Sequence, residues 1–349
     1  MYDIVGKRNL WFAISALLTI PGLIFIFLGG LRPSIDFTGG TEWEVRYADT
    51  PTAAEVTSFL TDANYDDVVV TELADGFLRI RTEPIDLIPP GGLDPAPSGS
   101  SAPSASASAD ASASAEPSAS ASASAEPSPS AEPTPAPIAG GTEFANLEDD
   151  LEDEFGAGEP RSVRTVGPII GADLIRSSAI LIVIGELFLL GYLWMRFGFR
   201  FGTAAIVALL HDVILVVGTF AILGYFFNVE FDALFVSALL TIIAFSVHDT
   251  IVVFDRIREN RVRHAGETFG AIVNHSILQT MSRSIITSIT VAVTLGALVL
   301  LGPPTIRTFG LALLLGVVSG TYSSIFNASQ LLVTWNEWDA KRKARPART

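Results

Sequence analysis

Residues 245–260 read FSVHDTIVVFDRIREN, and this stretch decides the fold of the chain. Its first half ends an apolar run that begins near Leu234 and is long enough to cross a bilayer, which takes about 20 helical residues. Its second half, from Asp255 to Asn260, is charged and is expected to emerge into water. Asp249 lies inside the apolar run, where a carboxylate costs about 2.5–3.5 kcal/mol on the insertion scale. Such acids usually face a bundle interior or a hydrated cavity, so we favour a functional role over simple hydrogen-bonded packing.

The composition is that of a polytopic membrane protein. The 349 residues have a mean hydropathy of +0.44, with 49% hydrophobic and only 17% charged residues. The net charge of −15 comes from acids concentrated between Asp36 and Glu159, so no basic domain is present to neutralise nucleic-acid phosphates. Cysteine is absent, which excludes disulfides and thiol catalysis. Because no phosphate loop, nucleophile triad or metal-ligand cluster appears, we expect neither an enzyme nor a metal or cofactor site.

Six apolar runs predict six membrane spans. Lys7 and Arg8 precede the first run, at 10–28, which is longer than the core of a secretory signal and is interpreted as an uncleaved span. Since Lys and Arg mark the cytoplasmic side, the basic second and fourth connections and the basic tail at 336–349 predict that both termini are cytoplasmic in the cell membrane. The other five runs, which form a membrane domain at 174–335, are 174–194, 202–223, 234–254, 285–301 and 309–335.

A folded domain outside the membrane is expected between the first span (residues 1–30) and the second. Its residues 36–88 and 142–166 show the order β-α-β-β-α-β, which is the α+β, ferredoxin-like arrangement. Residues 89–141 interrupt it with Ala, Ser and Pro, a composition that cannot bury enough apolar surface to order the chain. We therefore predict a disordered insertion. The predicted strands are 42–47, 68–73, 77–82 and 162–166, and the predicted helices are 52–62 and 142–155.

Taken together, these motifs resemble the SecF family of protein-export subunits, within the resistance–nodulation–division superfamily. The shared stretches are DFTGGT at 36–41, VGP at 166–168, HDV at 211–213, DTIVVFDRIREN at 249–260 and SRS at 282–284. One departure is His248, where the family usually has Asn. The family-motif residues are Asp36, Gly39, Gly40, Asp255, Arg256, Arg258, Glu259 and Asn260.

The resemblance implies a protein that uses the proton-motive force to assist protein export, with protons as the coupling ion. Its implied partners are SecD, the SecYEG translocon, preprotein substrates and the lipid bilayer, with no nucleic acid. Two alternatives stay open: a small-molecule or lipid transporter of the same superfamily, and a passive scaffold that stabilises a translocon. A chain with six spans has half of the usual twelve-span unit, which favours a partner chain resembling SecD.

Asp249 and Arg283 are the predicted proton-coupling pair. A buried acid and a buried cation make one another tolerable, so we expect them to face each other across the fourth and fifth spans. Arg283 is predicted to open the fifth span, above a Thr stripe that begins with Thr287 and that we assign to interhelical hydrogen bonding. His211 and Asp212 are assigned mainly a structural role.

Two further features stay secondary. Histidine is the side chain suited to passing protons near neutral pH, so His248 and His211 are candidate relay residues. Gly316 and Gly320 are one helical turn apart, which predicts a close packing seam with another helix, either of this chain or of a sister subunit.

Overall fold

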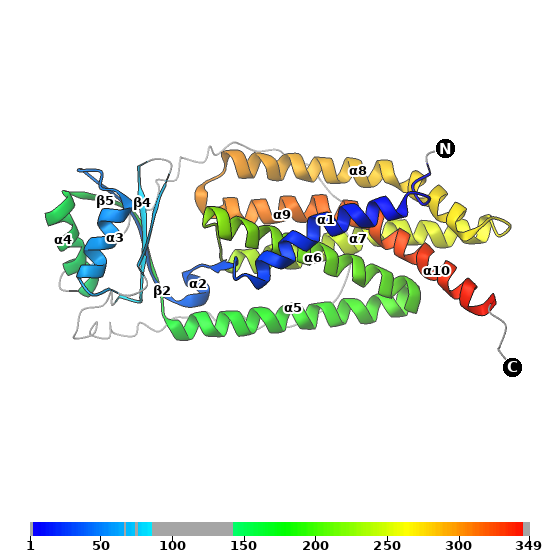
Figure 1. The fold of residues 1–349 in the computed structure, drawn as a ribbon, viewed down its shortest axis with the longest axis horizontal. Coiled ribbons are helices and arrows are strands. Elements are labelled where there is room, and N and C mark those ends of the chain that lie inside the picture. Colours follow the sequence, from blue (N-terminus) through cyan, green and yellow to red (C-terminus); the bar gives the residue numbers. More distant parts are fainter. Residues whose placement is uncertain (1–2, 66–67, 74–75, 86–141, 345–349) are drawn as a thin grey trace, which may run out of the picture. The chain divides into compact units, whose positions relative to one another are not determined.

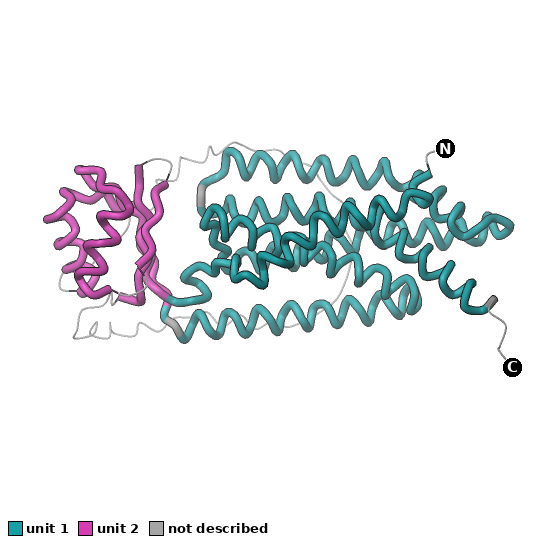
Figure 2. The backbone as a smooth tube through the Cα atoms, viewed as in Figure 1, with its two compact units in different colours: residues 1–39, 167–349 teal, residues 40–166 magenta. Residues whose placement is uncertain are grey.

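The computed structural model describes residues 3–65, 68–73, 76–85 and 142–344. The predicted insertion at 89–141 lies outside these residues. The chain forms two compact units, shown in different colours in Figure 2. One comprises Met1–Gly39 with Gly167–Thr349, and the other is Gly40–Val166.

The first unit is a helix bundle, in which six described helices are long and apolar enough to cross a membrane. The prediction of a polytopic α-helical membrane protein with six spans is confirmed. The last span is continuous but contains one π-helical turn, which is the kind of irregularity often found at functional sites. The long helices labelled in Figure 1 are α1 (Arg8–Phe27), α5 (Pro168–Phe197), α6 (Phe199–Phe227), α7 (Ala233–Arg263), α8 (Phe269–Leu301), α9 (Pro304–Ser323) and α10 (Ser329–Ala344). The π-helix η1 (Ser324–Ala328) joins α9 to α10.

Helix α8 begins well before the apolar run from which it was predicted. The side chain of Thr268 caps it by accepting a hydrogen bond from the backbone of Ala271, and the helix then runs for 33 residues. Arg283 therefore lies in the middle of α8, and the prediction that it opens the span is wrong. The helix extends because its first half is amphipathic: Val273 and Ile277, one turn apart, are buried in the bundle core.

Glycines set the closest helix crossings of the bundle. A Cβ atom on Gly22 of α1 would lie 2.8 Å from the Cα of Gly218 on α6, so the two backbones touch. The predicted Gly316–Gly320 seam exists, but it packs on α7 of the same chain. A Cβ on Gly320 would lie 3.1 Å from the Cβ of Ser246. Within the described residues, this seam needs no sister subunit.

The second unit has the predicted ferredoxin-like order, and this prediction is confirmed. Its four strands are ordered β3-β4-β2-β5, and all neighbours are antiparallel. Helices α3 and α4 pack on one face of the sheet (Figure 1), where Trp43, Leu60 and Phe144 belong to one buried core. The elements are β2 (Gly40–Tyr47), α3 (Ala53–Asp62), β3 (Val69–Glu72), β4 (Leu78–Thr82), α4 (Glu143–Phe155) and β5 (Gly158–Val166).

Candidate functional site

Asp249 is a buried acid with one oxygen bonded and one free. It lies on α7 and is 7% exposed. The hydroxyl of Ser284 on α8 donates a 2.6 Å hydrogen bond to its Oδ1. Its Oδ2 is also buried and has no partner among the described residues. Since buried polar atoms are nearly always hydrogen-bonded, this oxygen is a natural position for a proton or a water molecule.

Arg283 is the chain neighbour of Ser284, yet it does not pair with Asp249. Among the described residues, its guanidinium forms neither an ion pair nor a hydrogen bond, and its side chain is exposed in this single chain. The described residues therefore show no ion pair or hydrogen bond between Asp249 and Arg283. The reason is helical geometry: successive residues point about 100° apart, so α8 presents Ser284 to Asp249 and turns Arg283 aside. The role of both residues in proton coupling stays a prediction.

The polar stripe of α8 continues on the same uncovered side. Thr287, Thr290 and Thr294 are exposed, and each hydroxyl donates to a carbonyl of its own helix, four residues earlier. Among the described residues, the predicted interhelical hydrogen bonds of these threonines are not formed, because no described helix covers that face. His248 on α7 is exposed as well.

Asp212 is the second acid of the bundle interior, and it is far better satisfied than Asp249. It is 1% exposed. Ser246 of α7 donates a 2.7 Å hydrogen bond to its Oδ2, and Ser319 of α9 donates a 2.7 Å hydrogen bond to its Oδ1. The hydroxyl of Ser323 of α9 also donates a hydrogen bond to Oδ2. His211 Nδ1 lies 3.2 Å from Oδ1. These hydrogen bonds tie α6 to α7 and α9.

Neither Ser284 nor Ser319 could be assigned as a partner of the acids from the sequence. Single serines are common, and the signals were the family stretch 282–284 for Ser284 and the position between Gly316 and Gly320 for Ser319. The seam also carries a 2.8 Å hydrogen bond between Thr250, next to Asp249, and Ser324, where the π-helix begins. The two acids therefore share one polar seam, which lies between α7 and the last span.

The charged motif after Asp249 fastens α7 to α8. The side-chain amide of Asn260 is buried and donates 2.9 Å hydrogen bonds to Ser276 and to Gln279. Arg256 donates to Gln279 and to Glu259.

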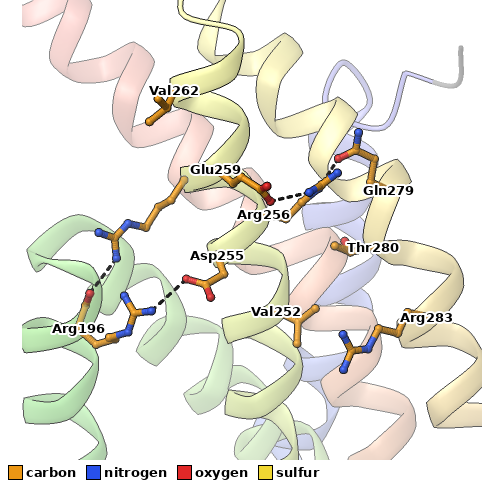
Figure 3. Close-up of a pocket in the computed structure, with 10 residues that line it drawn as sticks. Arg196, Val252, Asp255, Arg256, Glu259, Val262, Gln279, Thr280 and Arg283 are labelled. Carbon is orange, nitrogen blue, oxygen red and sulfur yellow. Dashed lines mark hydrogen bonds and ion pairs between the residues drawn. The ribbon is translucent and has the colours of Figure 1, made fainter.

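Around the motif lies a cavity of about 780 Å³ between α5, α7 and α8, shown in Figure 3. Its lining residues are Arg196, Val252, Asp255, Arg256, Arg258, Glu259, Val262, Gln279, Thr280 and Arg283.

The other family motif caps α7 at its far end. Asp36 Oδ2 accepts a 3.0 Å hydrogen bond from the backbone nitrogen of Ala233, the first residue of α7. Asp36 belongs to the short helix α2 (Ile35–Thr38), which follows β1 (Arg32–Pro33); β1 pairs with β6 (Glu230–Phe231). Gly39 and Gly40 follow with φ of 75° and 133°, conformations that other residues rarely adopt.

Comparisons with known proteins show what this arrangement is similar to. A family model described as "Protein export membrane protein SecD/SecF, C-terminal" matches residues 146–338. The chain is 43% identical to the protein translocase subunit SecF of Thermobaculum terrenum, over 98% of this chain and 96% of that one. It is 35% identical to the SecF subunit of Anaerolinea thermophila, over 99% of each chain.

A solved structure has the same fold. The crystal structure of SecDF from Thermus thermophilus, a translocon-associated membrane protein, matches with a TM-score of 0.73 at 29% identity. The match covers 96% of this chain and 39% of that one, so this chain spans about two fifths of the solved SecDF.

Proposed function

This chain belongs to the SecD/SecF family of protein-export membrane proteins, and from that premise we propose that it couples the proton-motive force to Sec-dependent export. The family membership makes it a multi-pass membrane protein with a Sec-associated role in protein export. The proposal adds the driving ion and the residues that handle it. It assigns no chemical catalysis to the chain.

The observation that carries the proposal is the half-satisfied carboxylate of Asp249. Protonation on Oδ2 neutralises a charge that is costly inside an apolar bundle, and it leaves the Ser284 bond to Oδ1 in place. Loss of that proton restores a buried anion, which then attracts a neighbouring cation that has no ion-pair partner among the described residues. Arg283 is that cation, because it stands one residue from Ser284 and has no described partner.

Asp212 keeps α6, α7 and α9 together while the protonation of Asp249 changes. Three serine hydroxyls hold Asp212 between α6, α7 and α9, so both of its carboxylate oxygens already have hydrogen-bond donors. A change at Asp249 therefore shifts α7 and α8 relative to each other more easily than it shifts α7 relative to α9. The family motif connects this movement to the other end of α7, where Asp36 caps the helix.

The uncovered face of α7 and α8 is where we place the partner SecD. Arg283, Thr287 and His248 are polar and exposed on the bilayer-length helices of this single chain. Lipid tails offer no partner for such groups, whereas the inner face of a second six-span chain does. The SecDF of Thermus thermophilus is a single chain whose name combines SecD and SecF, and this chain matches only 39% of its length in the solved structure. We further propose the SecYEG translocon and its preproteins as the working assembly.

The test replaces Asp249 by Asn, which has the shape of the protonated acid but cannot release a proton. Expected is normal chain level and normal co-purification of SecD, with loss of the stimulation of export by the proton-motive force. Export of a precursor in inverted vesicles, with and without an ionophore, measures this. Asp173→Asn on α5 is the matched control, since Asp173 is exposed and remote from the seam. Export by Asp249→Asn that stays fully stimulated removes Asp249 from the mechanism and favours a scaffold.

Orientation is tested separately, in this cysteine-free chain. We propose the cytoplasmic membrane, with both termini cytoplasmic, because of the basic connections. A single Cys at Thr61, exposed in the second unit, should react with an impermeant maleimide on intact spheroplasts. A single Cys at Arg263, at the end of α7, should react only after lysis. The opposite labelling reverses the topology and the direction of proton flow.

A further inference from the structure

The lining of the cavity around the charged motif contains more positively charged than negatively charged side chains. Four arginines face only two carboxylates across its lining, an excess of two positive charges. Arg196 pairs with Asp255 at 3.4 Å, which is a long contact, and Arg256 pairs with Glu259 on its own helix. Arg258 and Arg283 have no carboxylate partner among the described residues. The cavity therefore presents two guanidinium groups, those of Arg258 and Arg283, that no described carboxylate neutralises.

Arg196 and Arg258 are both held in place, Arg196 by a long ion pair to Asp255 and Arg258 without a carboxylate partner among the described residues. Arg258 Nη1 donates 2.9 Å to the backbone carbonyl of Arg196, which leaves its other N–H groups available. Both guanidiniums also lie over the ring of Phe197, at 5.0 and 5.7 Å from its centroid. Two forks that come from different helices and are positioned by one aromatic ring suit a tetrahedral oxyanion with several acceptor oxygens.

The surroundings of the two arginines are apolar and uncovered. Met195, beside Arg196, is 85% exposed, and Val262, which lines the cavity, is 81% exposed. Phe199 at the start of α6 is exposed too. An arginine pair at the end of a bilayer-length helix, bordered by exposed apolar side chains, matches a charged headgroup that continues into acyl chains.

We propose that this cavity binds the phosphate group of an anionic phospholipid through Arg196 and Arg258. The ligand group is a phosphate oxyanion. The lipid is its source because acyl chains can pack against the exposed apolar side chains at the border of the cavity, whereas a free phosphate cannot. The site lies beside Arg283 but does not use it, so it is separate from the proton-coupling pair.

Binding of phosphatidylglycerol to the purified full chain tests the site. Native mass spectrometry in detergent gives the bound fraction against lipid concentration. The double variant Arg196→Gln/Arg258→Gln should bind about thirtyfold more weakly, the equivalent of about 1 kcal/mol for each basic residue. The matched control is Arg176→Gln/Arg261→Gln, which removes two exposed charges from the same two helices but outside the cavity. It should bind as the wild type does.

A second double variant guards against misfolding. Arg196→Lys/Arg258→Lys keeps both charges and should recover most of the affinity, although it loses the planar fork. Inorganic phosphate is the competing probe: no displacement at a hundredfold excess supports the lipid source, whereas displacement at equal concentration supports the same oxyanion site but overturns the lipid source.

Two outcomes overturn the site itself. One is equal phosphatidylglycerol binding by the wild type and the Gln double variant. The other is loss of co-purifying SecD from that variant with lipid binding unchanged, because the arginines would then serve a carboxylate of a partner chain.

Discussion

Replacing Asp212 by Ala tests how far the bundle depends on one buried carboxylate. The substitution removes the acceptor of three serine hydroxyls, from α7 and α9. Hydrogen bonds between membrane helices contribute about 0.6 kcal/mol each on average, with a maximum of about 1.7. Three of them give a loss of about 2 kcal/mol in the free energy of unfolding. The hydroxyl of Ser323 already lies 3.3 Å from the carbonyl oxygen of Gly320. In the variant this hydroxyl can donate to that carbonyl of its own helix, which limits the loss of stability.

Asp212→Asn separates hydrogen bonding from shape. The amide keeps one acceptor oxygen, and the serine hydroxyls can accept from its NH₂ group, so about half of the loss is expected. The assay is reversible unfolding in mixed detergent micelles, followed by intrinsic fluorescence. Asp173→Ala, at an exposed position on α5, is the control and should stay within about 0.5 kcal/mol of the wild type.

A double-mutant cycle with Ser319→Ala then measures the pair directly. A coupling energy of about 0.6–1.7 kcal/mol between Asp212 and Ser319 is expected. Asp212→Ala with wild-type stability, or a coupling energy near zero, would refute the view that Asp212 anchors the seam between α7 and α9.

Three other predictions address different parts of the chain. Gly22→Val should cost about 1–3 kcal/mol of unfolding free energy, because its Cβ would meet the backbone of Gly218; Gly191→Val, with nothing within 4 Å of its Cβ, is the control in the same unfolding assay. Burial raises the pKa of the Tyr47 phenol above its ordinary value, and nearby acids add to this, so the folded second unit keeps a proton that the unfolded chain loses. Stability should thus fall as pH rises above about 10, and Tyr47→Phe should flatten that fall in a pH series of thermal melts; an unchanged slope contradicts it. Deletion of residues 90–139, with a short flexible linker, should leave export intact at normal chain level, as a precursor-export assay would show.

Patterns that repeat along the chain were enough to predict the elements. An apolar run of bilayer length forms a helix because its backbone has no other hydrogen-bonding partner in lipid, so the six spans follow from the sequence alone. The α+β order of the second unit follows from strand and helix periods and from the capping residue Thr52, whose side chain bonds the backbone of Glu55. Asp249 was found because an acid in such a run is rare and costly.

The partners of each acid, by contrast, were decided by helix rotation and by the register between helices. Ser284 and Arg283 are neighbours in the chain, and only the packing of α8 on α7 determines which of them meets Asp249. The serine partners of Asp212 were decided in the same way. Ser319 reaches Asp212 because Gly320 lets α9 pack closely on α7. A sequence specifies which residues share a helical face, but the direction of that face depends on contacts with every neighbouring helix at once. For this protein, the sequence therefore determined the spans and the costly acid, and the tertiary structure determined what that acid is bonded to.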